Sequence, residues 1–384
     1  MNIQLIREHE KFSALRAEWN DLLSRSSTDT IFLTWEWLSS WWECYAQADD
    51  ILRIIVVRES PGGELIGIVP LYQRAQPWLP FRSIKTLRFI GDGSADSDYL
   101  DAIVIRGREE EILTYVWKWL CSELPSWDLL QLTTIPETSL TCRWLKATGD
   151  NAEVVSRRER MPCLVADLPP SWEDYLPSLQ PRFRTKIRST LGNILSRHKV
   201  CFRSVESERD LKAGLQTLYD LHGKRWAMKQ ADGVFLNPAK RQFYERFTSR
   251  FLAAGWLVFD FLELDGIAAA CQLCFRYRGT QFLLQEGFDP EFASESVGVA
   301  LRAMVFKKAI ENGIRHYDFL AGLGRHKTQW QARMKYCQTV ALGRRTIPNR
   351  MYLELPIVAQ TVRERVKMIL PARALEACRR VASS

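Results

Sequence analysis

The sequence has no long apolar run. Its most apolar stretch, GIAAACQLCF at residues 266–275, is much shorter than the roughly 18 residues of a membrane-spanning helix, so it is better interpreted as a buried strand. The amino terminus, MNIQLIREHEKF, is charged and has no apolar segment followed by small residues. This pattern excludes a signal peptide, and we expect a cytoplasmic protein.

Metal-binding and nucleophilic motifs are also missing. The sequence has no zinc-ligand spacing, no Ser-His-Asp arrangement and no Walker-type loop, and its five histidines are dispersed. Nine cysteines, an odd number scattered through the chain, do not form a disulfide framework. Cys271 and Cys274 lie three apart on a predicted strand and therefore point to opposite faces, which excludes a shared metal ion. We predict no metal site.

The composition is that of a large globular protein with little excess charge in its body. The 384 residues suggest two or three domains, and 18 Phe, 14 Trp and 11 Tyr provide for a large core. The net charge is 53 − 45 = +8. Residues 344–384 contribute nine basic and three acidic residues, 9 − 3 = +6, which leaves about +2 for the rest. We therefore expect no specific DNA binding.

The order of the predicted elements repeats once along the chain. Helices, a strand meander, a helix and a strand occur before residue 160 and again after it. The second meander, residues 256–288, turns at Asp265-Gly266 and Arg278-Gly279. We predict an α/β (α+β) fold with two similar domains, 1–160 and 161–345, each a mixed, mostly antiparallel sheet flanked by helices.

Residues 346–384 form a basic tail with the pattern of an amphipathic helix. Its apolar stripe consists of Val358, Val362, Val366 and Ile369. This helix could dock on the body, or it could attach the protein to an anionic membrane face or a partner. The sequence of the tail is compatible with both.

The segment FDPEFASESVGVALRAM, residues 288–304, leads from a strand into a helix. The first amides of a helix have no partner inside it, and together with the helix dipole they favour an anion. Gly298 would allow a phosphate to approach the backbone closely. The segment is therefore either a phosphate site or an ordinary capped helix.

Several segments, in order, resemble one family. They are FLTWEWLSSWWE (32–43), GELIGIVPLY (63–72), GDGSADSDYLD (91–101), LHGKRWAMKQADGVF (221–235) and FLLQEGFDPEFASESVGVALRAMVFKKAIENGIRHYDFLAGLGRHKTQW (282–330). They resemble the BioF2-like or CelD-like GNAT acyltransferases, relatives of the Fem-type aminoacyl transferases. The resemblance covers about residues 1–345, leaves out the tail, and implies two GNAT-like domains in tandem.

The resemblance implies that acyl-CoA is the donor and that its pyrophosphate lies on the helix start formed by Ser296, Val297, Gly298, Val299 and Ala300. The family motif is Gln or Arg, two residues, Gly, one residue, then Gly or Ala. Glu295 occupies the first of these places, and its carboxylate would repel a pyrophosphate if it faced the site. Ser296-Val297-Gly298 corresponds to a Ser-Pro-Gly variant of the family.

Two carboxylates are candidate catalytic groups. Glu286, in the strand FLLQEGF, is expected to share a face with Phe282, Leu284 and Phe288. Its pKa should then be raised, so that it could act as a general base for an amine. The alternative is an ion pair with a basic residue of a neighbouring helix. Asp318, expected to share a face with His316 and Leu320, is the second carboxylate, with either a catalytic or a bracing role.

Lys327 lies in GRHKTQW, a segment that resembles the Tyr-Lys-x-x-Trp motif of the family, with His326 in place of the tyrosine. The resemblance implies that Lys327 contacts a substrate phosphate, although a lysine at this position could simply be solvated. Without the tyrosine, His326 is the candidate general acid.

Further candidates lie on helices and in a loop. His222, Arg225 and Trp226 fall at i, i+3 and i+4 and could bind substrate from one helix face, as could Gln285 from its strand. Packing alone would also explain them. Asp96, Asp98, Tyr99 and Asp101 form a family landmark that either turns the chain or faces the cleft between the domains.

The leading hypothesis is an N-acyltransferase that moves an acyl group from acyl-CoA to an amine on a sugar, lipid or envelope-polymer precursor. A basic stretch with seven Lys or Arg and no acid, residues 182–203, keeps an aminoacyl-tRNA donor open as an alternative. A degenerate GNAT pair that serves as a scaffold is the third hypothesis. A peripheral contact with the inner face of a membrane, through the tail, is an additional expectation.

Overall fold

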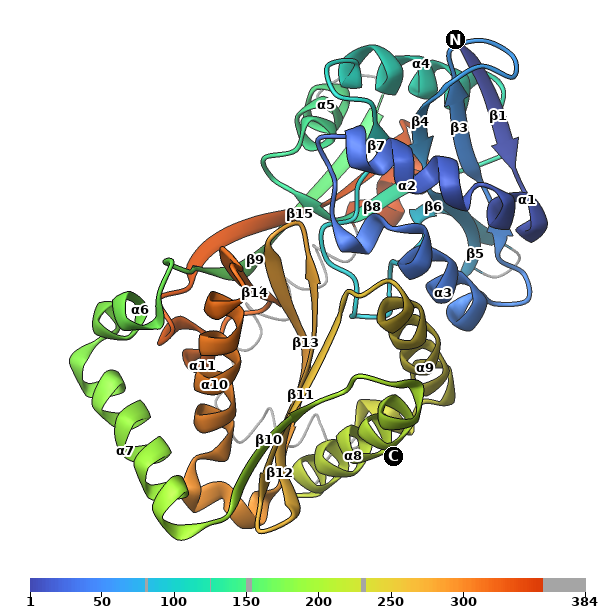
Figure 1. Cartoon of the computed structure of the whole chain (residues 1–384). Coiled ribbons are helices and arrows are strands. Elements are labelled where there is room, and N and C mark those ends of the chain that lie inside the picture. The colour runs from blue at the N-terminus through green and yellow to red at the C-terminus, as the bar shows by residue number, and fades with distance from the viewer. Residues whose placement is uncertain (80–81, 125, 150–153, 229–232, 355–384) are drawn as a thin grey trace, which may run out of the picture.

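The computed structural model describes residues 1–79, 82–124, 126–149, 154–228 and 233–354. It is a mixed α/β structure with an N-terminal and a C-terminal half, and strands pass between the two (Figure 1). The predicted mixture of mostly antiparallel sheets and flanking helices is confirmed.

The N-terminal half contains eight strands and five helices among the described residues up to 149. They are β1 (Asn2–Ile6), α1 (His9–Ala14), α2 (Arg16–Arg25), α3 (Trp35–Tyr45), β2 (Ile51–Leu52), β3 (Ile54–Arg58), β4 (Leu65–Val69), β5 (Leu71–Leu79), β6 (Arg82–Phe89), β7 (Ile103–Val104), α4 (Glu109–Ser122), β8 (Leu129–Pro136) and α5 (Leu140–Gly149).

The C-terminal half follows a long connecting strand. Its elements are β9 (Val154–Asp167), α6 (Trp172–Ser178), α7 (Pro181–Arg197), β10 (Val200–Ser204), α8 (Glu208–Ala227), α9 (Pro238–Ala253), β11 (Leu257–Leu264), β12 (Ile267–Tyr277), β13 (Thr280–Phe288), the 3₁₀ turn η3 (Pro290–Glu295), α10 (Val297–Glu311), β14 (His316–Ala321), α11 (Arg325–Thr328) and β15 (Arg333–Arg344).

Turn residues define the meander β11–β12–β13 as predicted. Asp265 and Gly266 have φ of 54° and 84°, and Arg278 and Gly279 have φ of 48° and 73°. Two consecutive residues with positive φ are typical of the tight hairpin turns that match the strand twist. Gly313, with φ of 69°, ends α10 as the sequence predicted, because glycine adopts this conformation without strain.

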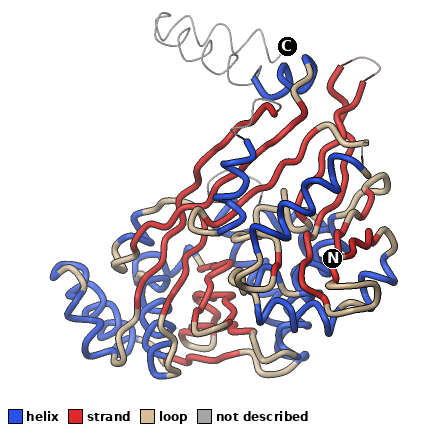
Figure 2. Tube along the Cα trace, turned by 90° about the horizontal axis from the view of Figure 1, so that it is seen from above, coloured by secondary structure: helices blue, strands red, loops and turns tan. Residues whose placement is uncertain are grey.

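One sheet runs through both halves in the order β10-β11-β12-β13-β14-β9-β15-β8-β6-β5-β2, and a smaller sheet has the order β1-β3-β4-β7. Long strands of the large sheet run side by side through the molecule (Figure 2). Strands β9 and β15 pair antiparallel from Arg333–Val165 to Arg344–Val154. Because β15 also pairs with β8, the end of the described chain completes the sheet of the N-terminal half.

Helices cover both faces of the meander. Helices α8 and α9 lie on one side of it, and α6, α7 and α10 lie on the other (Figure 1). Each side has its own apolar core. Cys271 belongs to the core on the α8–α9 side and Cys274 to the core on the α10 side, as expected for alternating strand residues. Among the described residues, no group of three or more potential metal ligands is present.

The loop at residues 96–101 forms hydrogen bonds between the N-terminal and C-terminal halves. The Lys240 ammonium donates to both oxygens of the buried Asp96 at 2.8 and 2.7 Å, and Asp98 accepts from the Ala321 amide at 3.0 Å. Beside this loop, Trp37 of α3 packs on Phe243 of α9, with ring centroids 5.0 Å apart. The loop was predicted either to turn the chain or to face the cleft between the domains. The structure supports the second alternative, because Asp96 and Asp98 contact residues of the C-terminal half.

Some elements were not predicted from the sequence. Strand β15 and helices α5 and α6 were missed, and Pro70 divides GELIGIVPLY between β4 and β5 because its ring removes an amide from the strand. The predicted domain border at residues 160–161 falls inside β9 and stays a prediction. Within the described chain, no helix is both long and apolar enough to cross a membrane. The predicted amphipathic stripe at residues 358–369 lies outside the described residues.

Candidate active site

Strands β13 and β14 separate from each other in the middle of the C-terminal half. They pair in parallel at Thr280–His316, Gln281–Tyr317 and Phe282–Asp318. Beyond Phe282, β13 continues to Phe288 along β12, whereas β14 follows β9 on its other edge. The sheet is therefore open between the carboxyl ends of β13 and β14, and α10 begins beside this opening.

A β-bulge in β13 determines which side chains reach the opening. The register between β12 and β13 shifts from Leu273–Gln285 to Cys274–Leu283, so that Leu284 is the extra residue and the alternation of faces changes there. Phe282 and Leu284 belong to the core on the α8–α9 side, whereas Glu286 contacts α10. The prediction that Glu286 shares a face with Phe282 and Leu284 is therefore wrong, although Phe288 does lie on the α10 side.

The start of α10 is an open turn. Ser296 has φ of 54°, and its carbonyl accepts from the amides of Val299 and Ala300 at 2.8 and 3.2 Å. The amides of Val297 and Gly298 precede these first helical bonds. A Cβ built on Gly298 would meet no atom within 4 Å, so a ligand has room to approach the backbone here.

Glu295 does not face this opening. Its carboxylate lies 3.4 Å from the guanidinium of Arg197 on α7, and it is not among the residues that line the adjacent cavity. The carboxylate in the first place of the family motif is therefore directed away from the position where an anion would lie on the helix.

A cavity of about 300 Å³ occupies the opening. Residues from the end of α8, β12, the end of β13, η3, the start of α10 and the segment after β14 line it. They include Arg225, Gln272, Glu286, Phe288, Ser296, Val297, Gly298, Val299, Arg302, His326 and Gln329. Four of the five predicted donor-binding residues thus line one cavity. The fifth, Ala300, is buried on the side of α10 that packs against the core.

Arg302 of α10 forms an ion pair with Glu286 at the base of this cavity, which we call the donor cavity. Arg302 also donates to the carbonyl of His326 at 2.7 Å, and Gln272 donates to Glu286 at 3.3 Å. Burial by itself would raise the pKa of Glu286, but the Arg302 guanidinium outweighs it and holds this pKa below its ordinary value. The prediction that the pKa of Glu286 is raised is therefore wrong, because the neighbouring guanidinium stabilises the ionised carboxylate. A carboxylate paired in this way is a weak base.

Sequence reasoning missed Arg302. Its signal was a single arginine within the otherwise apolar VGVALRAMVF, four residues after Gly298 and therefore on the same helix face. Because its side chain is only 5% exposed, a partner had to be present in the fold, and Glu286 is that partner.

His326 is at the rim of the donor cavity, on α11. Partial burial lowers its pKa below the ordinary value of 6.5, and the nearby Glu286 only partly opposes this effect. The imidazole is therefore neutral at pH 7, a form that can accept a proton but is not ready to donate one. The neutral imidazole favours a role of His326 as a general base rather than the predicted role as a general acid.

Lys327 has a different environment from the one predicted. Its ammonium donates to the carbonyls of Phe319, Ala321 and Gly322 at 2.8, 2.8 and 3.3 Å. All three donors of the ammonium are engaged by the end of β14. Lys327 is therefore not simply solvated but holds the end of β14 in place, and its contact with a substrate phosphate stays a prediction.

The three candidate residues on α8 have different surroundings in the structure. Arg225 lines the donor cavity, with its guanidinium 5.3 Å from the centroid of Phe288. His222 accepts from the indole of Trp226 at 2.9 Å and packs on Phe235. Burial lowers the pKa of His222 to about 4, so this imidazole is a neutral packing group. Only Arg225 of the three reaches the cavity.

Gln285 is directed away from the donor cavity as well. It interacts with Tyr244 of α9, on the face of the meander opposite Glu286, because the bulge at Leu284 reverses the alternation at this point. Gln285 is therefore not among the residues that line the donor cavity, and its role in substrate binding stays a prediction.

Asp318 lies on the opposite face of the sheet from Glu286. Its carboxylate accepts from the Tyr99 hydroxyl and the Leu320 amide, both at 2.8 Å. With His316, as predicted, it lines a second cavity of about 340 Å³ that includes residues of both halves. Burial raises the pKa of Asp318 to about 7. The two candidate acids therefore do not flank one ligand.

Comparisons with known proteins agree with this geometry. Residues 181–328 match the family of acetyltransferase (GNAT) domains, and no curated protein matches the chain. The crystal structure of FemX is 12% identical, with 88% of this chain and 97% of that chain covered and a TM-score of 0.59. A conserved protein of unknown function from Bacteroides thetaiotaomicron is 13% identical, with coverages of 89% and 100% and a TM-score of 0.55.

The structure of L-PGS from Bacillus licheniformis is 12% identical, with 91% of this chain and 96% of that chain covered and a TM-score of 0.52. At identities this low, the similarity shows a shared fold alone. The aligned regions extend over both halves of the chain. The predicted fold class, a mixed α/β structure with GNAT-like organisation and flanking helices, is thus confirmed. The opened strands and the helix start lie within residues 181–328, the part of the chain that matches the acetyltransferase (GNAT) domain, and this match supports a transferase.

Proposed function

We propose that the chain is an N-acyltransferase of the BioF2-like or CelD-like type, which moves an acyl group from acyl-CoA to an amine on a sugar, lipid or envelope-polymer precursor. The observation that supports this proposal most strongly is the donor cavity, which places the open turn of α10 beside the separated strands β13 and β14. The family match over residues 181–328 supports the acyl-CoA donor in general terms.

The donor cavity suits the phosphates of coenzyme A. The amides of Val297 and Gly298 and the positive end of the α10 dipole, about half a charge, favour an anion at this position. Arg225 adds a cation to the cavity wall, and Arg302 compensates the charge of Glu286. The acyl end of the donor would then lie between β13 and β14.

Acyl transfer requires an acceptor amine without its extra proton. The amine nitrogen forms a bond to the thioester carbonyl carbon, the carbon–sulfur bond breaks, and coenzyme A leaves as a thiolate that takes up a proton. We assign the removal of the proton from the amine to His326, because it is neutral and lines the donor cavity. Asp318 would act on the acceptor side, from the cavity on the opposite face.

An aminoacyl-tRNA donor is the alternative, and the surface of α7 favours it. Arg182, Lys186 and Arg188 are exposed on this helix, which contacts both α10 and η3. Exposed cations on a helix that packs against α10 would also suit a polyanionic donor. The two donors differ in the salt dependence of binding, which is steep for a nucleic acid.

A side chain at position 298 tests the donor cavity directly. Gly298→Leu should leave the fold intact, because a Cβ there meets nothing within 4 Å, yet it should fill the approach to the helix start. We expect the Kd for coenzyme A and acetyl-CoA, measured by calorimetry, to rise at least about tenfold, equivalent to about 1.4 kcal/mol.

The matched control is Gly192→Leu in the middle of α7, where a Cβ also meets nothing within 4 Å. Both variants replace a helical glycine by a better helix former, so their effects on stability should be similar. Equal affinities of Gly298→Leu and wild type, with Gly192→Leu as reference, would exclude the α10 turn as the donor site.

A further inference from the structure

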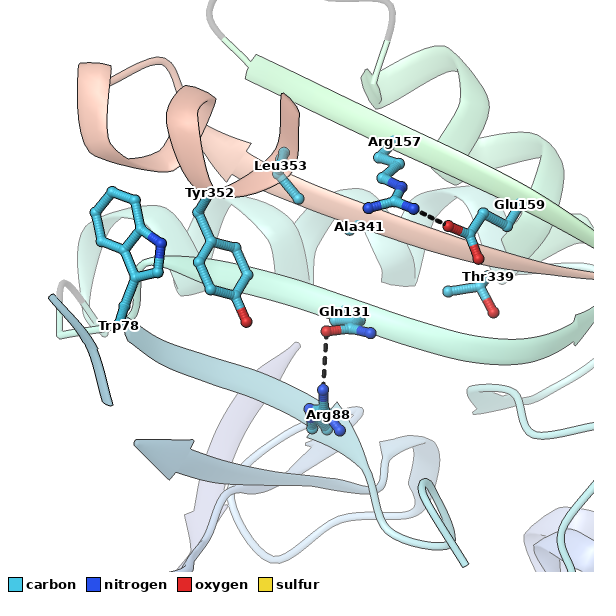
Figure 3. Close-up of a pocket in the computed structure, with 9 residues that line it drawn as sticks. All are labelled: Trp78, Arg88, Gln131, Arg157, Glu159, Thr339, Ala341, Tyr352 and Leu353. Atoms are coloured by element: carbon cyan, nitrogen blue, oxygen red, sulfur yellow. Dashed lines mark hydrogen bonds and ion pairs between the residues drawn. The ribbon is translucent and has the colours of Figure 1, made fainter. Parts of the chain in front are cut away.

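A third cavity, of about 360 Å³, lies on the large sheet of the N-terminal half and shares no lining residue with the donor cavity (Figure 3). Strands β5, β6, β8, β15 and β9 form it, together with the helical residues 347–354. Its size is at the lower end of the range for small-molecule sites, about 300–1,000 Å³. Neither the family match nor the proposed transfer reaction uses it.

Its floor is a row of side chains on one face of four neighbouring strands. Arg88 is the cross-strand partner of Gln131, Gln131 of Ala341, and Ala341 of Arg157. Cross-strand partners point to the same face of a sheet. The small side chain of Ala341 leaves a hollow between polar neighbours, and Thr339 beside Glu159 extends the row.

One wall of this cavity is aromatic. Trp78 and Tyr352 meet edge to face, with centroids 5.9 Å apart and planes at 75°. The Tyr352 hydroxyl donates to Gln76 at 3.2 Å, and both Trp78 and Tyr352 pack against the small apolar cluster that contains Leu353. Both rings are thus held in place, and Figure 3 shows them across the cavity from Arg157, Glu159 and Thr339.

The charges of the floor are balanced within the protein. Arg157 forms an ion pair with Glu159, and Arg88 donates to Asp92 and to Gln131, both at 3.0 Å. Two guanidinium groups thus face two carboxylates, which gives no excess charge for a phosphate or an ammonium ligand. Among the described residues, the Nε of Arg88 is buried and has no hydrogen-bond partner, which leaves a donor unpaired at the floor.

We propose that this cavity binds a sugar unit, independently of the transferase reaction. A pyranose has an apolar C–H face that packs on aromatic rings such as Trp78 and Tyr352, and hydroxyl groups that both donate and accept. The opposite side supplies donors and acceptors in the charged pair Arg157–Glu159, the hydroxyl of Thr339 and the amide of Gln131. An uncharged ligand with one apolar face and a polar rim matches this arrangement.

The test uses ligand-observed NMR titrations of the full chain. The probes are glucose, galactose and N-acetylglucosamine, the β-1,4-linked trimers of glucose and of N-acetylglucosamine, and AMP as an aromatic, anionic comparison. We expect at least one sugar probe to bind with a Kd of about 10 mM or lower. Trp78→Ala and Gln131→Leu should each weaken this binding at least tenfold, whereas Trp78→Phe, which keeps a ring, should weaken it much less.

Two controls separate loss of the site from loss of the fold. Binding of coenzyme A at the other cavity, or an unchanged Tm if coenzyme A does not bind, shows that the Trp78 and Gln131 variants are folded. Arg225→Ala, in the donor cavity, should leave sugar binding unchanged. The proposal is overturned if no sugar probe binds, if binding is indifferent to both substitutions, or if AMP binds more tightly than every sugar and is lost in Trp78→Ala.

Discussion

Replacing Arg302 with methionine should lower the free energy of unfolding by about 2–4 kcal/mol. Removal of the guanidinium leaves Glu286 without its partner at the base of the donor cavity, and a buried carboxylate without compensation is strongly destabilising. The effect should be below that of a fully enclosed pair, because 26% of the Glu286 side chain remains exposed. Urea unfolding followed by circular dichroism measures it.

The double variant Arg302→Met with Glu286→Leu distinguishes charge from packing. Without either charge, no uncompensated ion remains, so most of the lost stability should return. Arg225→Met is the matched control, since Arg225 lines the same cavity but is only half-buried, and its replacement should cost less than about 1 kcal/mol. A double variant as unstable as Arg302→Met would contradict the assigned pairing.

Asp318→Asn should become more stable relative to the wild type as the pH rises from 5 to 8. Burial raises the pKa of Asp318 from 3.8 to about 7 in the folded protein. The native state therefore holds a proton that the unfolded chain has released, and its stability falls as the pH rises towards 7. The neutral asparagine removes this loss.

The expected gain of the variant over this range is about 2–3 kcal/mol, because each pH interval of one contributes about 1.4 kcal/mol until the pKa is passed. Asp265→Asn is a control that should show no such trend between pH 5 and 8. The hydrogen bond with His198 holds the pKa of the exposed Asp265 below 3.8, so this carboxylate is ionised in both the folded and the unfolded chain over that range. Parallel pH profiles of Asp318→Asn and the wild type would show that Asp318 is ionised at neutral pH in the folded protein.

Local patterns in the sequence predicted the elements around the site. The apolar period of residues 297–311, the two-residue turns of the meander and the glycine after α10 depend on short-range chemistry, and all three occur in the structure. Gly298 lines the donor cavity, and its role in phosphate binding stays a prediction. Such features depend on neighbours within a few residues, which a sequence displays directly.

The positions of the candidate acids could not be predicted in this way. A single extra residue, Leu284, turns Glu286 to the α10 side, and a strict alternation of faces cannot anticipate a bulge. The partner of Asp318 is Tyr99, 219 residues earlier in the chain. Strand β15 was missed because it completes the sheet of the other half, a pairing that depends on long-range topology.

Calorimetric titration of the full chain with acetyl-CoA tests the central claim most directly, with an aminoacyl-tRNA titrated in parallel over a range of salt concentrations. We predict binding of one acetyl-CoA per chain at the start of α10, with a weak salt dependence and with loss of affinity in Gly298→Leu. No heat with coenzyme A, acetyl-CoA or longer acyl-CoAs, together with steeply salt-dependent tRNA binding, would contradict the acyl-CoA donor and favour the aminoacyl-tRNA alternative.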